Sequence, residues 1–328
     1  MKIAVSLGLW QDRPPTEVLR TAAIAEAEGF AELWIGEMAT YDVFALATAV
    51  AGVTERIPLV LGPLAVTVRD PMMIAMGVAS VASLTGRSVG VALGTSSTVV
   101  VEQWHGRSRA QSTRALAESA TAVRSLLAGE KAQVDGEVVR TIGFRLRTPA
   151  HAGPLTIAAF GPASVRVAAA HADRMVLNLI SPDRAAELIA AVNTAAAAIG
   201  RPAPRIALWV PAAVDPTEAA WTQLRTTLVG YLAAPGYGEM FTRDGFGELV
   251  RLARSGAHPR DVLAAIGADL PAAIGLAGDR ETVAARMAAY QAAGVDELVV
   301  VPASTVDDEA GAGTLKAVSD LRSALPTR

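Results

Sequence analysis

The chain has 328 residues, of which 52% are hydrophobic and 19% are charged, and its formal net charge at neutral pH is -3. This composition excludes a disordered protein, and the charge offers no basic surface for nucleic acid. The chain has no cysteine and only four histidines. Because these histidines are widely spaced, we expect no metal site, and without cysteine there is no disulfide or thiolate nucleophile.

Short apolar segments alternate with Ala-rich amphipathic segments that end at a glycine. The apolar segments that read as strands span residues 2–9, 31–37, 57–66, 88–94, 155–160, 174–179, 205–214 and 296–302. Strands separated by helices predict a parallel sheet with crossover helices, and eight such units match a TIM barrel. We therefore predict an α/β protein with a (β/α)8 barrel fold, built as one domain over residues 1–328.

The first expected strand follows Met1 and Lys2 directly, which differs from the pattern of a signal peptide. No uninterrupted apolar run reaches the roughly 18 residues that a membrane span needs. The sequence therefore predicts a cytoplasmic protein that does not associate with membranes.

Two segments depart from the alternation. Residues 130–148 read as a hairpin, in which Asp135 and Gly136 suit a two-residue type I′ turn between the strands. Residues 234–271 follow the seventh strand and are helical in pattern and rich in glycine and proline. This segment is longer than an ordinary connection, so we expect an insertion that covers the mouth of the barrel.

Ligands of a (β/α)8 barrel bind at the carboxyl ends of the strands, and few ionisable residues follow the predicted strands. Gly94, Thr95, Ser96 and Ser97 offer amides and hydroxyls without charge. They suit a polyol chain or ring oxygens, although Ser and Thr in a loop also bond locally. The segment 161–164 opens a helix after the fifth strand and suits a phosphate, although it also fits a plain helix start with proline.

Other candidates stand alone at these strand ends. Glu37 ends the second strand, where it could donate a proton or contact a ligand, or could be an acid in a solvated loop. His105 is the only histidine near the predicted mouth, a position in which histidine is more often structural. Trp10 could stack on a flat ligand. Since no Gly-x-Ser-x-Gly elbow, Walker loop or Rossmann fingerprint occurs, we expect a bound cofactor to carry the reaction.

Several stretches in order resemble the bacterial luciferase-like superfamily, and in particular its coenzyme F420-dependent oxidoreductase branch. They are "AEGFAELWIGEM", "RIPLVLGPLAVTVRDP", "ASLTGRSVGVALGTSS", "RALAESATAVRSLLAGE" with "DGEVV", "LTIAAFGPASVRVAAAHADRMVLNLISP" and "GLAGDRETVAARMAAYQAAGVDELVVVP". Each stretch is loose by itself, but the ordered set is specific and covers most of residues 2–302.

The resemblance implies an eight-stranded barrel that places a deazaflavin or flavin ring against a bulge at the end of the third strand. It implies a non-prolyl cis peptide near Leu64 and Ala65, with Val66 and Thr67 beside it. Residues 94–97 would line the ring and its ribityl-type chain. The cofactor phosphate would be received by Phe160, Gly161, Pro162, Ala163 and Ser164.

The chain departs from the family at the predicted mouth. Many deazaflavin dehydrogenases carry an Asp-His pair after the second strand, whereas this chain has Glu37 and Met38. Glu37 could keep the acidic role, while Met38 cannot transfer a proton and would line the substrate pocket together with Trp10. Ser97 stands where relatives place an acid. These departures favour a substrate of modest charge, such as an enone-like or imine-like acceptor.

The leading functional hypothesis is an F420-dependent oxidoreductase that transfers a hydride between C5 of the deazaflavin and a small organic substrate. An FMN-dependent monooxygenase of the same superfamily, which needs O₂ and a partner flavin reductase, is the alternative enzyme. A protein that binds a flavin or deazaflavin without catalysis is the alternative of another class. The resemblance also implies a homodimer.

Overall fold

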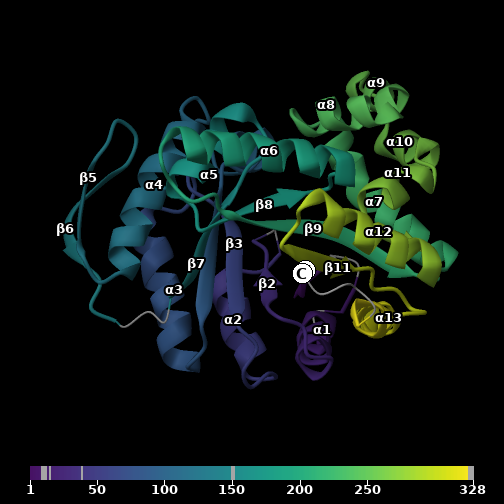
Figure 1. Cartoon of the computed structure of the whole chain (residues 1–328), viewed down its shortest axis with the longest axis horizontal. Helices are drawn as coiled ribbons and strands as arrows, with labels where there is room; N and C mark the ends of the chain where they lie inside the picture. Colours follow the sequence, from purple (N-terminus) through teal and green to yellow (C-terminus); the bar gives the residue numbers. More distant parts are fainter. Residues whose placement is uncertain (9–12, 15, 38–39, 149–151, 324–328) are drawn as a thin grey trace. The chain divides into compact units, whose positions relative to one another are not determined.

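The structure is a computed structural model, and it describes residues 1–8, 13–14, 16–37, 40–148 and 152–323. Strands and helices alternate along most of the chain (Figure 1). The chain forms two compact units. The first unit comprises Met1–Gly29, Leu177–Leu188 and Leu208–Arg328, and the second comprises Phe30–Val176 and Ile189–Ala207.

In the second unit, neighbouring strands are parallel and run in the order β2, β3, β4, β7 and β8. These strands span Leu33–Ile35, Leu59–Ala65, Val89–Gly94, Ala152–Ala158 and Arg174–Asn178. The helices span Val43–Ala51 (α2), Pro71–Thr85 (α3), Ser112–Leu127 (α4) and Pro162–His171 (α5). Helix α6 (Pro182–Ala198) belongs to this unit from Ile189 onward. The strands are apolar along nearly their whole length, as expected of a parallel sheet that is covered on both faces.

In the first unit, β1 (Lys2–Ser6) is parallel to β11 (Glu297–Pro302), and β9 (Arg205–Val214) is parallel to the short β10 (Leu276–Gly278). The longer helices are α1 (Thr16–Ala27), α7 (Glu218–Ala233), α12 (Arg280–Ala293) and α13 (Ala312–Arg322). All eight predicted strands are present, and β10 is an addition. The fold is therefore the (β/α)8 barrel predicted from the sequence.

The segment after β9 and α7 is helical, as predicted. It contains α8 (Tyr237–Phe241), the π-helix η2 (Thr242–Phe246), α9 (Gly247–Arg254), α10 (Pro259–Ala265) and α11 (Asp269–Ile274). A buried apolar cluster that includes Phe241, Val250 and Leu270 holds these helices to α7. We refer to residues 234–275 as the insertion.

The predicted hairpin is present, but its predicted turn is wrong. Strands β5 (Lys131–Asp135) and β6 (Arg140–Arg145) are antiparallel, and Asp135 pairs with Arg140, so a four-residue loop replaces the two-residue turn. The reason lies in α4, where the carboxylate of Glu118 accepts the backbone N–H groups of residues 137–139 at 2.7–3.0 Å. A carboxylate from another element thus determines the shape of the loop.

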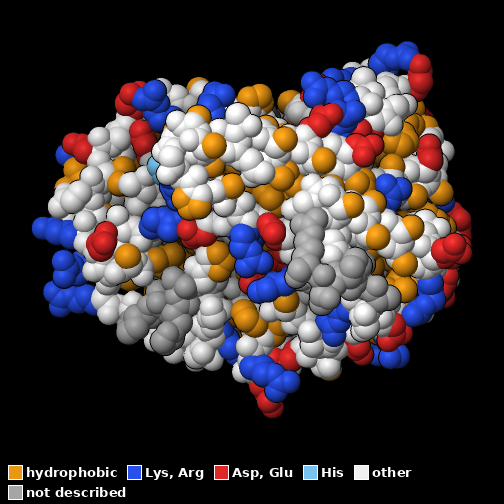
Figure 2. Space-filling view, viewed as in Figure 1, with side chains coloured by type: hydrophobic (Ala, Val, Ile, Leu, Met, Phe, Trp, Pro, Cys, Tyr) orange, Lys and Arg blue, Asp and Glu red, His pale blue; other side chains and the backbone are white. Residues whose placement is uncertain are grey.

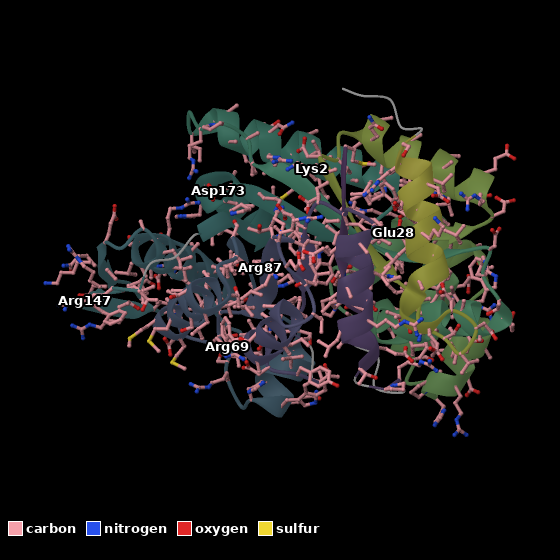
Figure 3. All side chains as sticks on the ribbon, turned by 90° about the horizontal axis from the view of Figure 1, so that it is seen from below. Lys2, Glu28, Arg69, Arg87, Arg147 and Asp173 are labelled. Atoms are coloured by element: carbon pink, nitrogen blue, oxygen red, sulfur yellow. The ribbon has the colours of Figure 1, made fainter. Side chains whose placement is uncertain are left out.

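The hairpin lies along α4 (Figure 1). Figure 2 shows basic side chains gathered at this edge, and Figure 3 labels Arg147, which follows β6, on the same side. The exposed basic residues here include Lys131, Arg140 and Arg145. Over the rest of the face in Figure 2, acidic and basic side chains are interspersed, in agreement with the small net charge.

Strand β3 contains the predicted bulge, but the predicted non-prolyl cis peptide near Leu64 and Ala65 is wrong. The register with β4 shifts between Leu61 and Leu64. Within the described ranges, the cis peptide bond is Gly62–Pro63, which is a prolyl bond. Prolyl bonds adopt the cis form far more readily than other peptide bonds, because their amide is tertiary.

A buried ion pair lies at the amino end of β8. Arg174 contacts the carboxylate of Glu32 at 2.7 Å and donates to the Thr156 hydroxyl at 3.1 Å. Its guanidinium carbon also lies 4.6 Å from the ring centroid of Trp34. The Arg174 side chain is 3% exposed and that of Glu32 is 15% exposed. The pair therefore belongs to the core at the end of the strands that does not hold ligands.

We expect Glu32→Gln to reduce the free energy of unfolding by about 2 kcal/mol, because it removes the carboxylate charge that the buried Arg174 guanidinium contacts at 2.7 Å. Urea denaturation followed by circular dichroism measures this loss. The matched control is Asp320→Asn, which removes a half-exposed partner of Arg280. That change should cost less than about 0.5 kcal/mol. Equal losses in the two variants would contradict the importance of burial.

Candidate functional site

Three of the predicted ligand-binding segments follow adjacent parallel strands of the second unit. Ala65 at the end of β3 pairs with Gly94 at the end of β4, and Leu93 pairs with Ile157 in β7. Since adjacent parallel strands end at the same edge, the structure brings residues 64–67, 94–97 and 160–164 to one edge of the sheet. This is the edge at which (β/α)8 barrels hold ligands.

The segment after β3 presents a buried apolar surface with one unusual hydroxyl. Leu64, Ala65 and Val66 are all buried. The Oγ1 atom of Thr67 is also buried and has no hydrogen-bond partner in the described part of the chain. A buried hydroxyl without a partner costs free energy, so this atom marks a place where a polar ligand edge would complete the bonding.

The segment after β4 is held by its own hydrogen bonds. A Cβ atom on Gly94 would lie 3.3 Å from the Cβ of Pro63, so this glycine permits close packing of β4 on β3. The Ser97 hydroxyl accepts the backbone N–H of Val100 at 3.2 Å. Ser96 is exposed and has a positive φ of 55°, a conformation that non-glycine residues adopt infrequently and that is enriched at functional sites.

Arg109 is a residue of this site that the sequence reasoning missed. Its guanidinium donates to the Ser96 carbonyl at 2.8 Å and to the Thr98 hydroxyl at 3.3 Å, and it lies 3.5 Å from the Thr95 hydroxyl. All of these acceptors are neutral. A positive charge therefore lies over the segment that the sequence presents as uncharged. No signal in the local sequence indicates it, because η1 (Val99–Trp104) separates Arg109 from the strand.

The amino end of α5 matches the predicted phosphate seat in its local geometry. Gly161 is the N-cap residue, and Pro162 begins the helix. The Ser164 hydroxyl donates to the Gly161 carbonyl at 3.0 Å, so it bonds locally. Among the described residues, a Cβ atom on Gly161 would meet only the Ser164 hydroxyl, at 3.8 Å, which leaves open space over the helix end. Pro162 and Ala163 are exposed, and Phe160 is half-buried.

Glu37 belongs to an ion-pair cluster rather than to a solvated loop. Arg69 donates from Nε to both carboxylate oxygens of Glu37, at 2.9 and 2.8 Å, and its Nη2 atom contacts Glu37 and Asp42. The hydrogen bonds to Glu37 raise the pKa of Arg69. Burial opposes ionisation of Asp42, but hydrogen bonds from Ala45 and Arg69 hold its pKa below the usual value. Figure 3 labels Arg69, the residue that joins the two carboxylates.

Of the remaining predicted site residues, His105 is the one that the structure describes, and it is not brought into this arrangement. His105 is exposed and follows η1, where its backbone N–H bonds to the Val100 carbonyl at 3.2 Å. Trp10 and Met38 lie outside the described residues.

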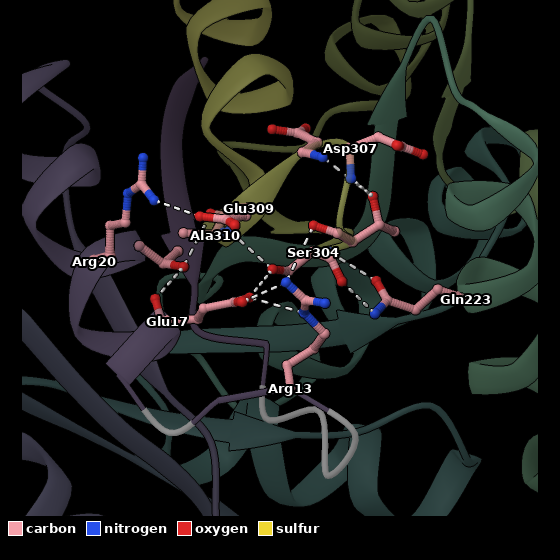
Figure 4. Close-up of polar contacts among 11 residues, drawn as sticks. Arg13, Glu17, Arg20, Gln223, Ser304, Asp307, Glu309 and Ala310 are labelled. Atoms are coloured by element: carbon pink, nitrogen blue, oxygen red, sulfur yellow. Dashed lines mark hydrogen bonds and ion pairs between the residues drawn. The ribbon is translucent and has the colours of Figure 1, made fainter.

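In the first unit, a polar network joins α1, α7 and the loop after β11 (Figure 4). The buried carboxylate of Glu17 accepts from Nε of Arg13 at 3.1 Å and from the Ser304 hydroxyl. Gln223 on α7 exchanges two 2.7 Å hydrogen bonds with the backbone of Ser304. Burial opposes ionisation of Glu17, but the hydrogen bonds from Arg13 and Ser304 lower its pKa. The network fixes the loop at the carboxyl end of β11.

The described parts of the chain contain no cluster of three or more His, Cys, Asp or Glu side chains that could hold a metal ion. Nor does any helix among the described residues have the length and apolar character needed to cross a membrane.

The profile of the luciferase-like monooxygenase family matches residues 3–297. A putative coenzyme F420-dependent oxidoreductase of Mycobacterium tuberculosis is 26% identical over 93% of this chain and 96% of its own. The 5,10-methylenetetrahydromethanopterin reductase of Methanolobus tindarius is 27% identical, but that alignment covers only 52% of each chain. The match to this second relative thus spans about half of its length.

Solved structures share the fold at lower identity. An F420-dependent tetrahydromethanopterin reductase from Methanopyrus kandleri has a TM-score of 0.83 and 18% identity, covering 97% of this chain and 98% of its own. The oxygenating constituent of a Baeyer–Villiger monooxygenase from Pseudomonas putida, solved with FMN, has a TM-score of 0.72 and 16% identity over 100% of both chains.

Proposed function

The chain belongs to the luciferase-like monooxygenase family, and from that membership we propose that it is a coenzyme F420-dependent oxidoreductase. The resemblance to the F420-dependent branch is confirmed by the M. tuberculosis relative, which aligns along nearly the whole chain. Fold alone does not assign a function, so the proposal also depends on how the described residues fit such a cofactor.

The observation that carries the proposal is the combination of features along the ends of β3, β4 and β7. An apolar surface formed by residues 64–66 lies beside the Thr67 hydroxyl, which has no hydrogen-bond partner among the residues that the structure describes. Farther along the same edge, the open amino end of α5 follows β7, the second strand from β3 in the sheet. A flat ring with polar edges and a phosphate at some distance matches this order of apolar, polar and anion-binding features.

When bound, reduced F420 supplies a hydride from its ring carbon C5. We propose that Leu64, Ala65 and Val66 exclude water from one ring face, while Thr67 bonds to the ring edge. Residues 94–97 contact the ring and its polyol chain, and residues 160–164 bind the phosphate. Arg69 holds the Glu37 carboxylate in a fixed position in the loop after β2, at the proposed opening of the cofactor site.

Titration of the purified protein with F420 and, separately, with FMN tests this proposal through ligand fluorescence. We expect micromolar binding of F420 and at least about tenfold weaker binding of FMN, which corresponds to about 1.4 kcal/mol. Binding of FMN alone would contradict the proposal. Binding of F420 without turnover across a broad panel of acceptors would instead support a storage protein.

The FMN-dependent monooxygenase is the second candidate, favoured by the likeness to the FMN-bound monooxygenase of P. putida. That reaction needs O₂ and a partner flavin reductase, so NADH and a reductase added with FMN test it directly.

The cytoplasmic location, the homodimer and the covering of the barrel mouth by the insertion stay predictions. Sedimentation velocity measures the oligomeric state.

A further inference from the structure

The guanidinium of Arg109 is held beside the end of β4 by neutral oxygen atoms. It donates to the Ser96 carbonyl at 2.8 Å, and its contacts with the hydroxyls of Thr98 and Thr95 are longer, at 3.3 and 3.5 Å. Its Nε atom is buried and has no hydrogen-bond partner among the described residues. A guanidinium has five N–H donors and bonds most strongly to an anion. Donors and charge therefore remain for a ligand.

The charged side chains of the same stretch do not neutralise Arg109. Glu102 is the only acidic residue among residues 95–115. Its carboxylate accepts the backbone N–H of Arg109 at 3.2 Å, and in the described part of the chain no carboxylate forms an ion pair with the guanidinium. The other ionisable residues of the stretch are all exposed, namely His105, Arg107 and Arg114.

The ends of the neighbouring strands of the second unit also leave this cation without an acidic partner. After β7, residues 159–165 contain no ionisable side chain. After β2, the carboxylates of Glu37 and Asp42 are both engaged by Arg69. Arg109 is half-buried and the Ser96 that it bonds is exposed, so a ligand can reach the guanidinium from solvent. Partial burial weakens screening by water, which strengthens the attraction of an anion.

We propose that Arg109 binds the anionic ring of the deazaflavin and thereby favours F420 over FMN. The proposal rests on the function proposed above, in which residues 94–97 contact the ring and the phosphate binds at the amino end of α5. The ring hydroxyl of a deazaflavin ionises near neutral pH, and the negative charge spreads over the conjugated ring. The oxidised ring of FMN lacks this hydroxyl and is neutral. A fixed cation beside the ring therefore distinguishes two cofactors of similar shape.

The ring is one of several anionic groups of F420, which also carries a phosphate and a glutamate tail. An arginine could bind any of these groups. The absorbance spectrum separates them, because it changes when the ring hydroxyl ionises and does not respond to the phosphate or the tail. The pKa of the bound ring, measured by absorbance, therefore reports the charge beside the ring itself.

The experiment is an absorbance titration of F420 bound to the whole protein between about pH 5 and about pH 8, with the affinity measured at both ends by fluorescence. We expect the unaltered protein to bind the anionic ring about tenfold more tightly than the neutral ring. Because this preference favours the ionised form, the pKa of bound F420 should lie about one below that of free F420. Arginine keeps its own charge throughout this range.

Arg109→Gln should return the pKa of bound F420 to the value of the free cofactor. It should weaken F420 binding about tenfold at the alkaline end and leave FMN binding unchanged. Arg109→Lys keeps the charge and should retain most of the preference for the anionic ring. Arg107→Gln is the matched control, because it removes the same charge from an exposed side chain two residues away. The pKa of bound F420 should not change in that variant.

Two results would overturn the proposal for Arg109. One is a bound F420 whose pKa in the unaltered protein equals that of free F420. The other is an Arg109→Gln variant that binds both ring forms more weakly by the same factor, which would assign Arg109 to the phosphate, to the tail or to the folding of residues 95–98. Failure of the unaltered protein to bind F420 at all would instead overturn the proposed function, so the two failures are distinguishable.

Discussion

Gly161→Glu is expected to raise the dissociation constant of F420 by at least about 100-fold, while the protein stays folded. The new carboxylate would stand at the amino end of α5, where we propose that the cofactor phosphate binds. Like charges in such close contact cost several kcal/mol, and about 2.8 kcal/mol corresponds to the stated factor. Fluorescence titration measures the affinity, and circular dichroism confirms the fold.

The local geometry explains why this substitution should be tolerated. Gly161 has φ of -86° and ψ of 153°, which any residue adopts. In the part of the chain that the structure describes, a Cβ atom would have only the Ser164 hydroxyl nearby, at 3.8 Å. Gly161→Gln is the matched control because it has the same size without the charge, and it should retain most of the affinity. Unchanged binding by Gly161→Glu would place the phosphate elsewhere.

Gly62→Ala should lower the free energy of unfolding by about 4 kcal/mol, the largest stability effect that we expect. Gly62 has φ of 113°, and a Cβ atom would lie 2.3 Å from the Ala92 carbonyl oxygen and 2.6 Å from the Leu64 nitrogen. Both are backbone atoms of paired strands and cannot move independently. The unfavourable φ and the overlap each cost about 1–3 kcal/mol. Urea denaturation gives the total.

Gly86→Ala is the control for the contribution of φ alone. Gly86 is the left-handed C-cap of α3, with φ of 68°, and no atom of the described residues would lie within 4 Å of its Cβ atom. We expect a loss of about 1 kcal/mol there. Similar losses at the two glycines would show that the contact with β4 is unimportant. Since Gly62 precedes residues 64–67 in the bulge, its substitution should also weaken cofactor binding.

Local sequence patterns were sufficient for the order of strands and helices. The helix that ends at Gly29 and the one that ends at Gly294 both stop at a glycine with positive φ, of 70° and 103°. An apolar run followed by a small residue also indicated the ends of β4 and β7. The ends of these helices and strands depend on neighbours within a few residues, so the local sequence pattern is sufficient to predict them. The alignment of residues 64–67, 94–97 and 160–164 followed from strand order.

Local sequence patterns could not predict the hydrogen-bond and ion-pair partners of the charged and polar side chains. Glu37 meets Arg69 across 32 residues, and Asn178 meets Tyr237 across 59 residues. Glu118 shapes the hairpin loop from 19 to 21 residues away. Such pairs depend on where separate elements cross in space, which local periodicity does not encode. The sequence by itself determined the barrel and the strand ends at which we propose that the cofactor binds, and only the tertiary structure decided which charged and polar groups are engaged with one another.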